Sequence, residues 1–244
     1  MKTLVIIPSR LSATRLPGKP LLKINGLSMI SHVLKKAQDA NIGEVFVAAE
    51  DQEIVNNVKE NGGEAILTSN KHKTGTDRIY EVVKKLNRSD IELVMNLQGD
   101  EPLINIEDIK KLDHLTKKNN CQINTLATNI DDKKLFDSVN TVKVQTEKKL
   151  EVENFSVAQN FSRFVDAGSQ NIYHHIGIYE FSVSSLKSFT NLSQSENEKK
   201  FKLEQLRALD NNIKVNVSYA SSKVIGIDTE EDYIELKKIM EYKN

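Results

Sequence analysis

The chain has 244 residues, 39% hydrophobic and 28% charged, so it can bury one substantial core, and α/β chains of this length often form a single domain. Lys plus Arg equals Asp plus Glu at 34 each, which argues against a nucleic-acid or acidic-membrane partner and favours a small molecule. No apolar run approaches the about 20 residues of a membrane span, and the first apolar stretch is too short for a signal peptide, so we expect a cytoplasmic protein. The single cysteine, Cys121, predicts neither an internal disulfide nor a zinc site.

Strands and helices alternate through the first half of the chain. The aliphatic run Leu4–Ile7 predicts a buried strand that Pro8 ends, and Ser28 is placed to cap a helix that runs to about Ala40. Further strands are expected at 45–49, 65–67 and 91–97, with one helix ending near Gly62 and another carrying Ile79 to Leu86 between them. This alternation predicts an α/β fold with a doubly wound, mainly parallel sheet, which binds ligands at its carboxyl edge.

The second half of the chain is less regular. Strands are expected at 123–130, 141–146 and 176–181, with a polar connection over 133–140 and few periodic signals over 147–170. A Lys- and Glu-rich helix is expected over 198–209, and a terminal helix from about Glu230. The break in rhythm predicts a small inserted lobe at approximately 141–181 within a single domain of residues 1–244, because no linker-like segment separates the two.

A basic loop follows the first strand. Arg10, Arg15 and Lys19 place three cations between Ile7 and Leu21, no acid offsets them, and Gly18 lets the main chain approach a ligand. Such a loop would neutralise a polyphosphate, although it matches neither the P-loop nor the dinucleotide-binding pattern. The alternative is a solvated basic surface loop.

Two acidic segments are candidates for a metal site. Asp100 follows the strand at 91–97, and Mg²⁺ needs few carboxylates when nucleotide oxygens and water complete its shell; the alternative role for Asp100 is helix capping. Asp228 precedes Thr229, which is expected to cap the terminal helix together with Asp232, so Asp228 is left for a ligand role. Two such acids fit metal-assisted phosphoryl or nucleotidyl transfer.

Taken together, these motifs resemble those of the 3-deoxy-manno-octulosonate (Kdo) cytidylyltransferases over essentially the whole chain. The segments that carry the resemblance are Ile7–Leu21, Thr74–Arg78, Asn96–Pro102, His174–Tyr179, Leu203–Arg207 and Gly226–Asp232. The sialic acid cytidylyltransferases share the general fold and the first of these segments but not Leu203–Arg207.

The resemblance implies a nucleotide-diphospho-sugar transferase-like fold and Mg²⁺-dependent transfer of CMP from CTP to the anomeric hydroxyl of Kdo, which gives CMP-Kdo and pyrophosphate for lipopolysaccharide assembly. It also implies a homodimer, with the inserted lobe serving sugar binding or dimerisation. The implied nucleotide-binding residues are Arg10, Arg15, Lys19, Thr76, Arg78 and Gln98. The implied catalytic residues are Lys19, Asp100 and Asp228, of which Asp100 and Asp228 would bind Mg²⁺. The implied sugar-binding residues are Arg163, His175, Tyr179, Glu204 and Gln205.

Several of these residues also have a purely structural alternative to ligand binding. Glu204 and Gln205 could be solvated on the surface of a helix, His175 could be a hydrogen-bonded histidine of a strand, and Thr76 could cap a helix.

The sequence departs from the family pattern in two places. An aromatic-Phe-Ser-Arg segment is matched partially twice, by Asn154–Val157 and by Asn160–Arg163; we favour the second because a guanidinium is the natural partner of a sugar carboxylate. Ala49–Glu50 stands where the family commonly has Thr-Asp. The altered sugar segment leaves 8-amino-Kdo or another acidic sugar open as the substrate, and a non-catalytic nucleotide-binding protein is the alternative of another class.

Overall fold

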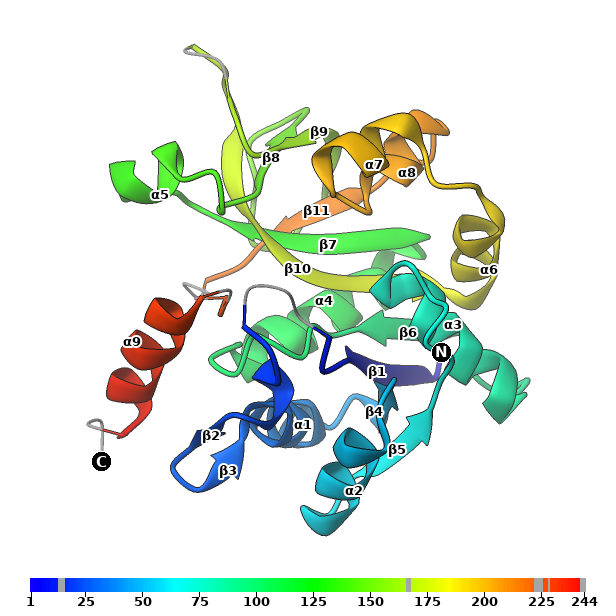
Figure 1. Cartoon of the computed structure of the whole chain (residues 1–244). Helices are drawn as coiled ribbons and strands as arrows, with labels where there is room; N and C mark the ends of the chain where they lie inside the picture. Colours follow the sequence, from blue (N-terminus) through cyan, green and yellow to red (C-terminus); the bar gives the residue numbers. More distant parts are fainter. Residues whose placement is uncertain (13–15, 166–167, 222–225, 228, 242–244) are drawn as a thin grey trace. The chain divides into compact units, whose positions relative to one another are not determined.

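The computed structural model describes residues 1–12, 16–165, 168–221, 226–227 and 229–241 (Figure 1). The chain divides into two compact units, unit 1 with Met1–Lys110 and Val224–Asn244 and unit 2 with Lys111–Lys223. Both units combine helices with β-strands, which confirms the expected α/β class. The single domain over 1–244 stays a prediction, because a compact unit is not by itself an independent domain. In the described part of the chain, no helix is long and apolar enough to cross a membrane.

Unit 1 contains parallel strands in the order β5 (Glu64–Leu67), β4 (Gly43–Ala49), β1 (Thr3–Ser9) and β6 (Leu93–Asn96). The chain moves outward from β1 through β4 to β5 and then returns to the other side of β1 with β6. The carboxyl ends of β1 and β6 therefore form a topological switch point, where open α/β sheets bind their ligands.

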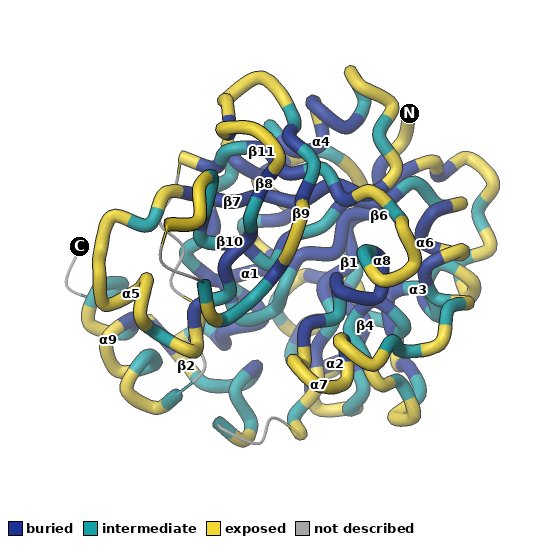
Figure 2. The backbone as a smooth tube through the Cα atoms, turned by 90° about the horizontal axis from the view of Figure 1, so that it is seen from above, coloured by how far each residue is buried: buried dark blue, intermediate teal, exposed yellow. Residues whose placement is uncertain are grey.

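Three helices connect these strands: α1 (Met29–Ala40), α2 (Gln52–Glu60) and α3 (Gly75–Leu86). Ser28 caps α1 as predicted, because its side chain accepts a hydrogen bond from the Ser31 N–H at 3.3 Å. The central strand β1 is buried along nearly its whole length, as Figure 2 shows. A mainly parallel sheet is confirmed for the described strands β1, β4, β5 and β6, while the doubly wound arrangement stays a prediction.

The C-terminal helix α9 (Glu230–Glu241) packs within unit 1, beside the short strand β2 (Lys23–Ile24) that pairs with β3 (Leu27–Ser28). Ile24, Met29, Ile227 and Leu236 form a fully buried apolar cluster there. Thr229 and Asp232 form the predicted capping arrangement: the Thr229 N–H donates to Asp232 at 2.8 Å, and the Asp232 N–H donates to Thr229 Oγ1 at 3.2 Å. Ile227 is therefore held by the apolar cluster that contains its side chain and by the capped start of α9 that follows it.

Unit 2 contains the strands β7 (Ile123–Thr128), β8 (Lys143–Thr146), β9 (Ser156–Ser162), β10 (Ile172–Ser182) and β11 (Asn216–Tyr219). They pair in the order β10-β7-β11-β9-β8. Because β8 also pairs with β10, the first and last strands of this order are hydrogen-bonded to each other. Among these described pairs only β7 with β11 is parallel, so the expectation of a mainly parallel sheet is wrong for this unit. The described residues of the connections from β8 to β9 and from β9 to β10 contain no helix, and antiparallel strands do not need a crossover helix. Residues 141–181, expected as an inserted lobe, provide β8, β9 and β10; a lobe function stays a prediction.

The helices beyond β6 differ in part from the expectation. Helix α4 (Ile106–Asn119) runs across the boundary between the units, α5 (Lys133–Asp137) lies where a polar connection was expected, and α6 (Val183–Asn191) follows β10. The single helix expected over 198–209 is wrong: it is two helices, α7 (Glu196–Phe201) and α8 (Leu206–Asp210). Lys202, with a left-handed φ of 55°, ends α7 and separates them.

Candidate functional site

A cavity of about 310 Å³ lies in unit 1 at the carboxyl ends of β1 and β6, within the size range of small-molecule sites. The loop after β1, the segment before α3 and the turn after β6 all contribute to its wall. The lining residues are Pro8, Ser9, Arg10, Leu16, Lys19, Pro20, His72, Lys73, Thr74, Gly75, Arg78, Gln98, Gly99 and Asp100. Five of the predicted site residues are therefore brought together: Arg10, Lys19, Arg78, Gln98 and Asp100.

The basic loop is closed by its own backbone. Gly18 adopts a left-handed φ of 69° and donates its N–H to the Leu11 carbonyl at 3.2 Å, while the Leu11 N–H donates to Asp51 at 2.9 Å. Arg10 is exposed at the cavity, whereas Lys19 is largely buried. Arg15 lies outside the described residues.

Lys19 connects the two acidic segments. Its ammonium donates to Asp100 Oδ2 at 2.7 Å and to the Ile227 carbonyl at 2.5 Å, and the Ile227 N–H donates to the Asp100 carbonyl at 3.3 Å. The turn after β6 and the segment before α9 are therefore held together around one cation. Asp228, the second predicted metal ligand, lies outside the described residues, but its neighbour Ile227 is fixed beside Asp100.

The turn after β6 packs tightly against β1. A Cβ on Gly99 would lie 3.1 Å from the Pro8 carbonyl oxygen and 3.2 Å from Ile30 Cδ1, so a side chain would push this turn away from β1. Gln98 donates to Asn96 at 3.5 Å, and Asn96 in turn donates to Thr76 Oγ1 at 3.2 Å.

The residue that caps α3 is Thr74. Its side chain accepts from the Asp77 N–H at 3.2 Å, so the alternative of capping by Thr76 is wrong. Thr76 lies two residues further along and is buried, and its hydroxyl accepts a hydrogen bond from Asn96. The amino-terminal end of α3 at Thr74 and Gly75 lines the cavity and contributes partial positive charge to it.

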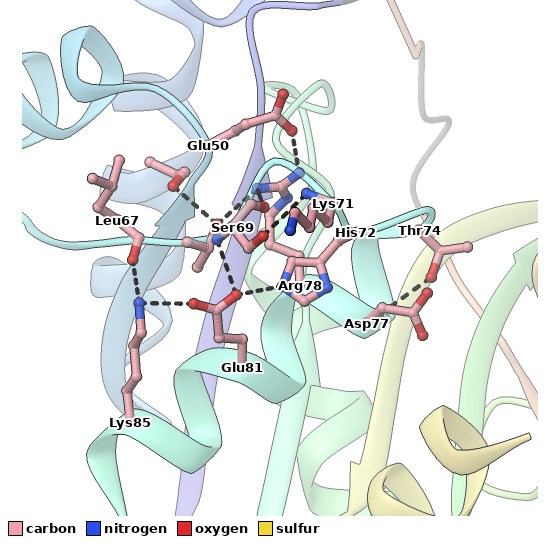
Figure 3. Close-up of polar contacts among 12 residues, drawn as sticks. Glu50, Leu67, Ser69, Lys71, His72, Thr74, Asp77, Arg78, Glu81 and Lys85 are labelled. Atoms are coloured by element: carbon pink, nitrogen blue, oxygen red, sulfur yellow. Dashed lines mark hydrogen bonds and ion pairs between the residues drawn. The ribbon is translucent and has the colours of Figure 1, made fainter.

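Arg78 and Glu81 hold the segment before α3 from two sides (Figure 3). The buried guanidinium of Arg78 forms an ion pair with Glu50 and donates to Thr68 Oγ1 at 2.7 Å and to the Ser69 carbonyl at 3.2 Å. Much of its hydrogen-bonding capacity is therefore used within the protein, and the departure at Ala49–Glu50 acquires a structural role. His72 and Lys73 were not predicted as site residues, although a basic Lys-His-Lys triplet directly precedes the Thr74–Arg78 motif.

Unit 2 brings together two of the candidate sugar-binding residues. The rings of His175 and Tyr179 lie 5.4 Å apart, and Phe161 meets His175 edge-on at 5.0 Å. Strand β10 is irregular between Ile176 and Tyr179, where Thr125 donates to the Ile178 carbonyl at 2.7 Å. This irregularity directs both rings to the same neighbourhood.

Burial sets the protonation of these two side chains. It lowers the pKa of His175 to about 3, with His174 adding to the effect, so His175 is neutral. Because the Thr125 hydroxyl donates to a carbonyl, it accepts from His175 Nε2 at 3.0 Å. Burial raises the pKa of Tyr179 well above its usual value, and the Glu204 carboxylate adds to the rise. The Tyr179 hydroxyl is buried without a hydrogen-bond partner among the described residues, which indicates a place for a polar ligand group.

The remaining sugar candidates sit at the ends of short elements. Glu204 and Gln205 lie in the turn between α7 and α8, so the expectation that they lie on a helix is wrong. Gln205 is also buried, which rules out surface solvation for this residue. Arg163 donates to the carbonyls of Val139 and Asn140 at 3.0 and 3.1 Å. Its contact with a sugar carboxylate stays a prediction.

The donor set at the cavity fits Mg²⁺ as a nucleotide-bound ion. No group of three or more His, Cys, Asp or Glu side chains could hold a metal within the described ranges. Asp100 nevertheless offers a partly exposed carboxylate beside Lys19 on the cavity wall, and Mg²⁺ commonly binds one or two carboxylates with phosphate oxygens and water.

Comparison with known proteins agrees with this arrangement. Residues 4–216 match the cytidylyltransferase family. A 3-deoxy-manno-octulosonate cytidylyltransferase of Thermodesulfovibrio yellowstonii is 43% identical, covering 95% of each chain, and 3-deoxy-manno-octulosonate cytidylyltransferase 2 of Actinobacillus pleuropneumoniae is 39% identical, covering all of both. The solved structure of a CMP:2-keto-3-deoxy-manno-octonic acid synthetase complexed with CTP superimposes with a TM-score of 0.89 at 31% identity, covering all of both chains.

A UDP-glucose pyrophosphorylase, at 14% identity and a TM-score of 0.72 over all of this chain and 99% of the other, shares the fold alone. The family match, the curated relatives and the CTP-complexed structure identify the chain as a nucleotidyltransferase. The chain belongs to the cytidylyltransferase family, and within it to the 3-deoxy-manno-octulosonate cytidylyltransferases.

Proposed function

We propose that this enzyme transfers CMP from CTP to the anomeric hydroxyl of Kdo, giving CMP-Kdo and pyrophosphate. The observation that carries the proposal is the contact between Lys19 and Asp100 on the wall of a cation-rich cavity, in a chain whose relatives bear this activity in their names. By family analogy the enzyme works in the cytoplasm as a homodimer, and its product serves lipopolysaccharide assembly.

On the nucleotide side, Arg10 and Lys19 bind the triphosphate, with Arg15 as a further cation of the same loop. Asp100 would hold Mg²⁺ together with Asp228, and the ion supplies positive charge that offsets the charge of the phosphate oxygens during transfer. Lys19, tied to Asp100 and to the Ile227 carbonyl, is oriented so that its ammonium can pass from these partners to the departing pyrophosphate. Gln98 completes the nucleotide side. Thr76 does not line the cavity and acts through its contact with Asn96, and Arg78 acts by fixing the wall.

On the sugar side, Tyr179 offers a hydroxyl that is already desolvated, and neutral His175 lies against it. Glu204 and Gln205 accept from or donate to sugar hydroxyls, and Arg163 binds the carboxylate. A site that pairs each polar group of the sugar rejects analogues that leave one of them unpaired.

Pyrophosphate release tests the proposal, measured with CTP, Mg²⁺ and Kdo and with UTP and metal-free reactions as controls. Release should require CTP, Kdo and Mg²⁺ together. Asp100→Asn should lower turnover about 100-fold or more, because the Mg²⁺ carboxylate is lost. Asp90→Asn is the matched control, since Asp90 is exposed and pairs with Lys2 and Arg88 outside the cavity. CTP binding without release for any acidic sugar would favour a non-catalytic nucleotide-binding protein.

A further inference from the structure

The segment Thr68–Thr74, between β5 and α3, is anchored to α3 by Glu81. One oxygen of this carboxylate accepts from the Ser69 N–H at 3.0 Å and from His72 Nε2, and the other pairs with Lys85 at 2.7 Å (Figure 3). Glu81 is only 17% exposed, so these donors replace most of its contact with water. The imidazole of His72 therefore has a fixed orientation at the cavity wall.

The carboxylate also fixes which ring nitrogen faces α3. Burial alone would raise the pKa of Glu81, but the hydrogen bonds from Lys85, His72 and Ser69 outweigh it and lower the pKa to about 2. Glu81 is therefore ionised at neutral pH, and the nitrogen that faces it, Nε2, donates. Nδ1 is the ring nitrogen that Glu81 leaves for another partner.

The groups that share the cavity with His72 select an anionic partner. The cations come from the loop after β1, from the segment before α3 and from α3 itself: Arg10, Lys19, Lys73 and Arg78. Of the described lining residues, Asp100 is the one acid, and it is already paired with Lys19. A phosphate oxygen accepts only from an N–H, so a bound phosphate would favour the ring form that donates from Nε2 to Glu81 and from Nδ1 to the anion.

We propose that His72 binds the phosphate groups of the nucleotide through Nδ1, and that Glu81 is the residue that positions its imidazole. The inference rests on the proposed function for the identity of the nucleotide. It assigns a role to two residues that lie outside the predicted site, and it explains why the segment before α3 is fixed by a carboxylate rather than left as a solvated loop.

Two substitutions of His72 distinguish the role of Nε2 from the role of Nδ1. A glutamine amide can reach the Nε2 position and keep the contact with Glu81, whereas an asparagine amide can reach only the Nδ1 position. The dissociation constants of CTP and of cytidine are measured by calorimetry with Mg²⁺. His72→Gln should weaken CTP about tenfold, the loss of one charge-assisted hydrogen bond, and leave cytidine unchanged. His72→Asn should retain more CTP affinity than His72→Gln.

Glu81→Gln tests the positioning role. It should raise the KM for CTP severalfold with a smaller change in kcat, because the imidazole loses its orientation while the reacting groups remain. Lys85→Met removes another partner of Glu81 that does not line the cavity, and the exposed His114 gives the control His114→Gln; both should leave KM unchanged. Circular dichroism and urea denaturation confirm that each variant is folded.

Unchanged CTP affinity in His72→Gln, or an equal loss for cytidine and CTP, would overturn the assignment. An effect of Lys85→Met on KM as large as that of Glu81→Gln would overturn the positioning role. The wild-type protein separates this inference from the proposed function: absence of CTP-dependent turnover in the wild type refutes the function, whereas normal turnover with an inert His72 refutes only the inference.

Discussion

The buried ion pair between Arg207 and Glu198 should dominate the stability of the α7–α8 region, which presents Glu204 and Gln205. The guanidinium donates from Nε to Glu198 Oε2 at 2.8 Å and from an Nη to Oε1 at 2.6 Å, with side chains 1% and 3% exposed. Arg207 also lies over the Phe189 ring at 4.6 Å, and Glu198 closes a capping box with Ser195. Glu198→Gln removes the carboxylate charge that both of these guanidinium hydrogen bonds meet.

Removing one partner of such a pair costs about 3–5 kcal/mol, a large share of the about 5–15 kcal/mol that stabilises a typical domain. Urea denaturation of Glu198→Gln, Arg207→Met and the double variant should show that the double loss is several kcal/mol smaller than the sum of the single losses. Glu196→Gln on the same helix is the matched control, because its pair with Lys199 is 93% and 52% exposed and should contribute about 0.5 kcal/mol or less.

The pH dependence of the unfolding free energy should also reflect the ion pair between Glu198 and Arg207. Burial alone would raise the pKa of Glu198, but hydrogen bonds from Arg207 and Gln194 lower it below the ordinary value. The stability that the Glu198 carboxylate contributes is therefore fully present above the pKa that Glu198 has in the unfolded chain. It is lost as pH falls through the lower pKa of Glu198 in the folded protein. A loss below about 1 kcal/mol in Glu198→Gln, or additive losses in the double variant, would refute the reasoning.

Three further predictions concern other sites. Burial raises the pKa of Glu180 from 4.5 to about 8, with Asp113 adding to the rise. The unfolding free energy should therefore fall as pH rises between these values, by up to about 1.4 kcal/mol per pH unit. Glu180→Gln should remove this slope, as measured by urea denaturation at several pH values. Gly99→Ala should cost about 1–3 kcal/mol of unfolding free energy and raise the KM for CTP, measured by denaturation and turnover. Arg163→Ala should raise the KM for the sugar without changing that for CTP; an unchanged sugar KM would place the carboxylate contact elsewhere.

Local signals in the sequence predicted much of unit 1. The aliphatic run of β1, the cap at Ser28 and the Thr229–Asp232 capping arrangement all depend on neighbouring residues, so a single sequence reveals them. The basic loop and the turn after β6 were predicted to form one ligand site because parallel strands end at the same edge, and Lys19 and Asp100 are in contact there.

The rest depended on contacts between distant residues. Strand β9 has two adjacent exposed polar residues, Gln159 and Asn160, which hide its alternation, and no propensity signals the left-handed Lys202 that divides α7 from α8. The role of Glu50 becomes visible only with Arg78 beside it. His72 was overlooked for the same reason, because its partner Glu81 is nine residues away, within α3.

The most direct test of the central claim is a competition assay that identifies the product. The enzyme is supplied with CTP and Mg²⁺ and with Kdo, 8-amino-Kdo and N-acetylneuraminate in equal amounts, and the CMP-sugars are quantified by mass spectrometry. CMP-Kdo should dominate, and its amount should equal the Kdo-dependent pyrophosphate released. A product mainly of the amino sugar or of N-acetylneuraminate would contradict Kdo as the substrate, and pyrophosphate without any CMP-sugar would contradict CMP transfer itself.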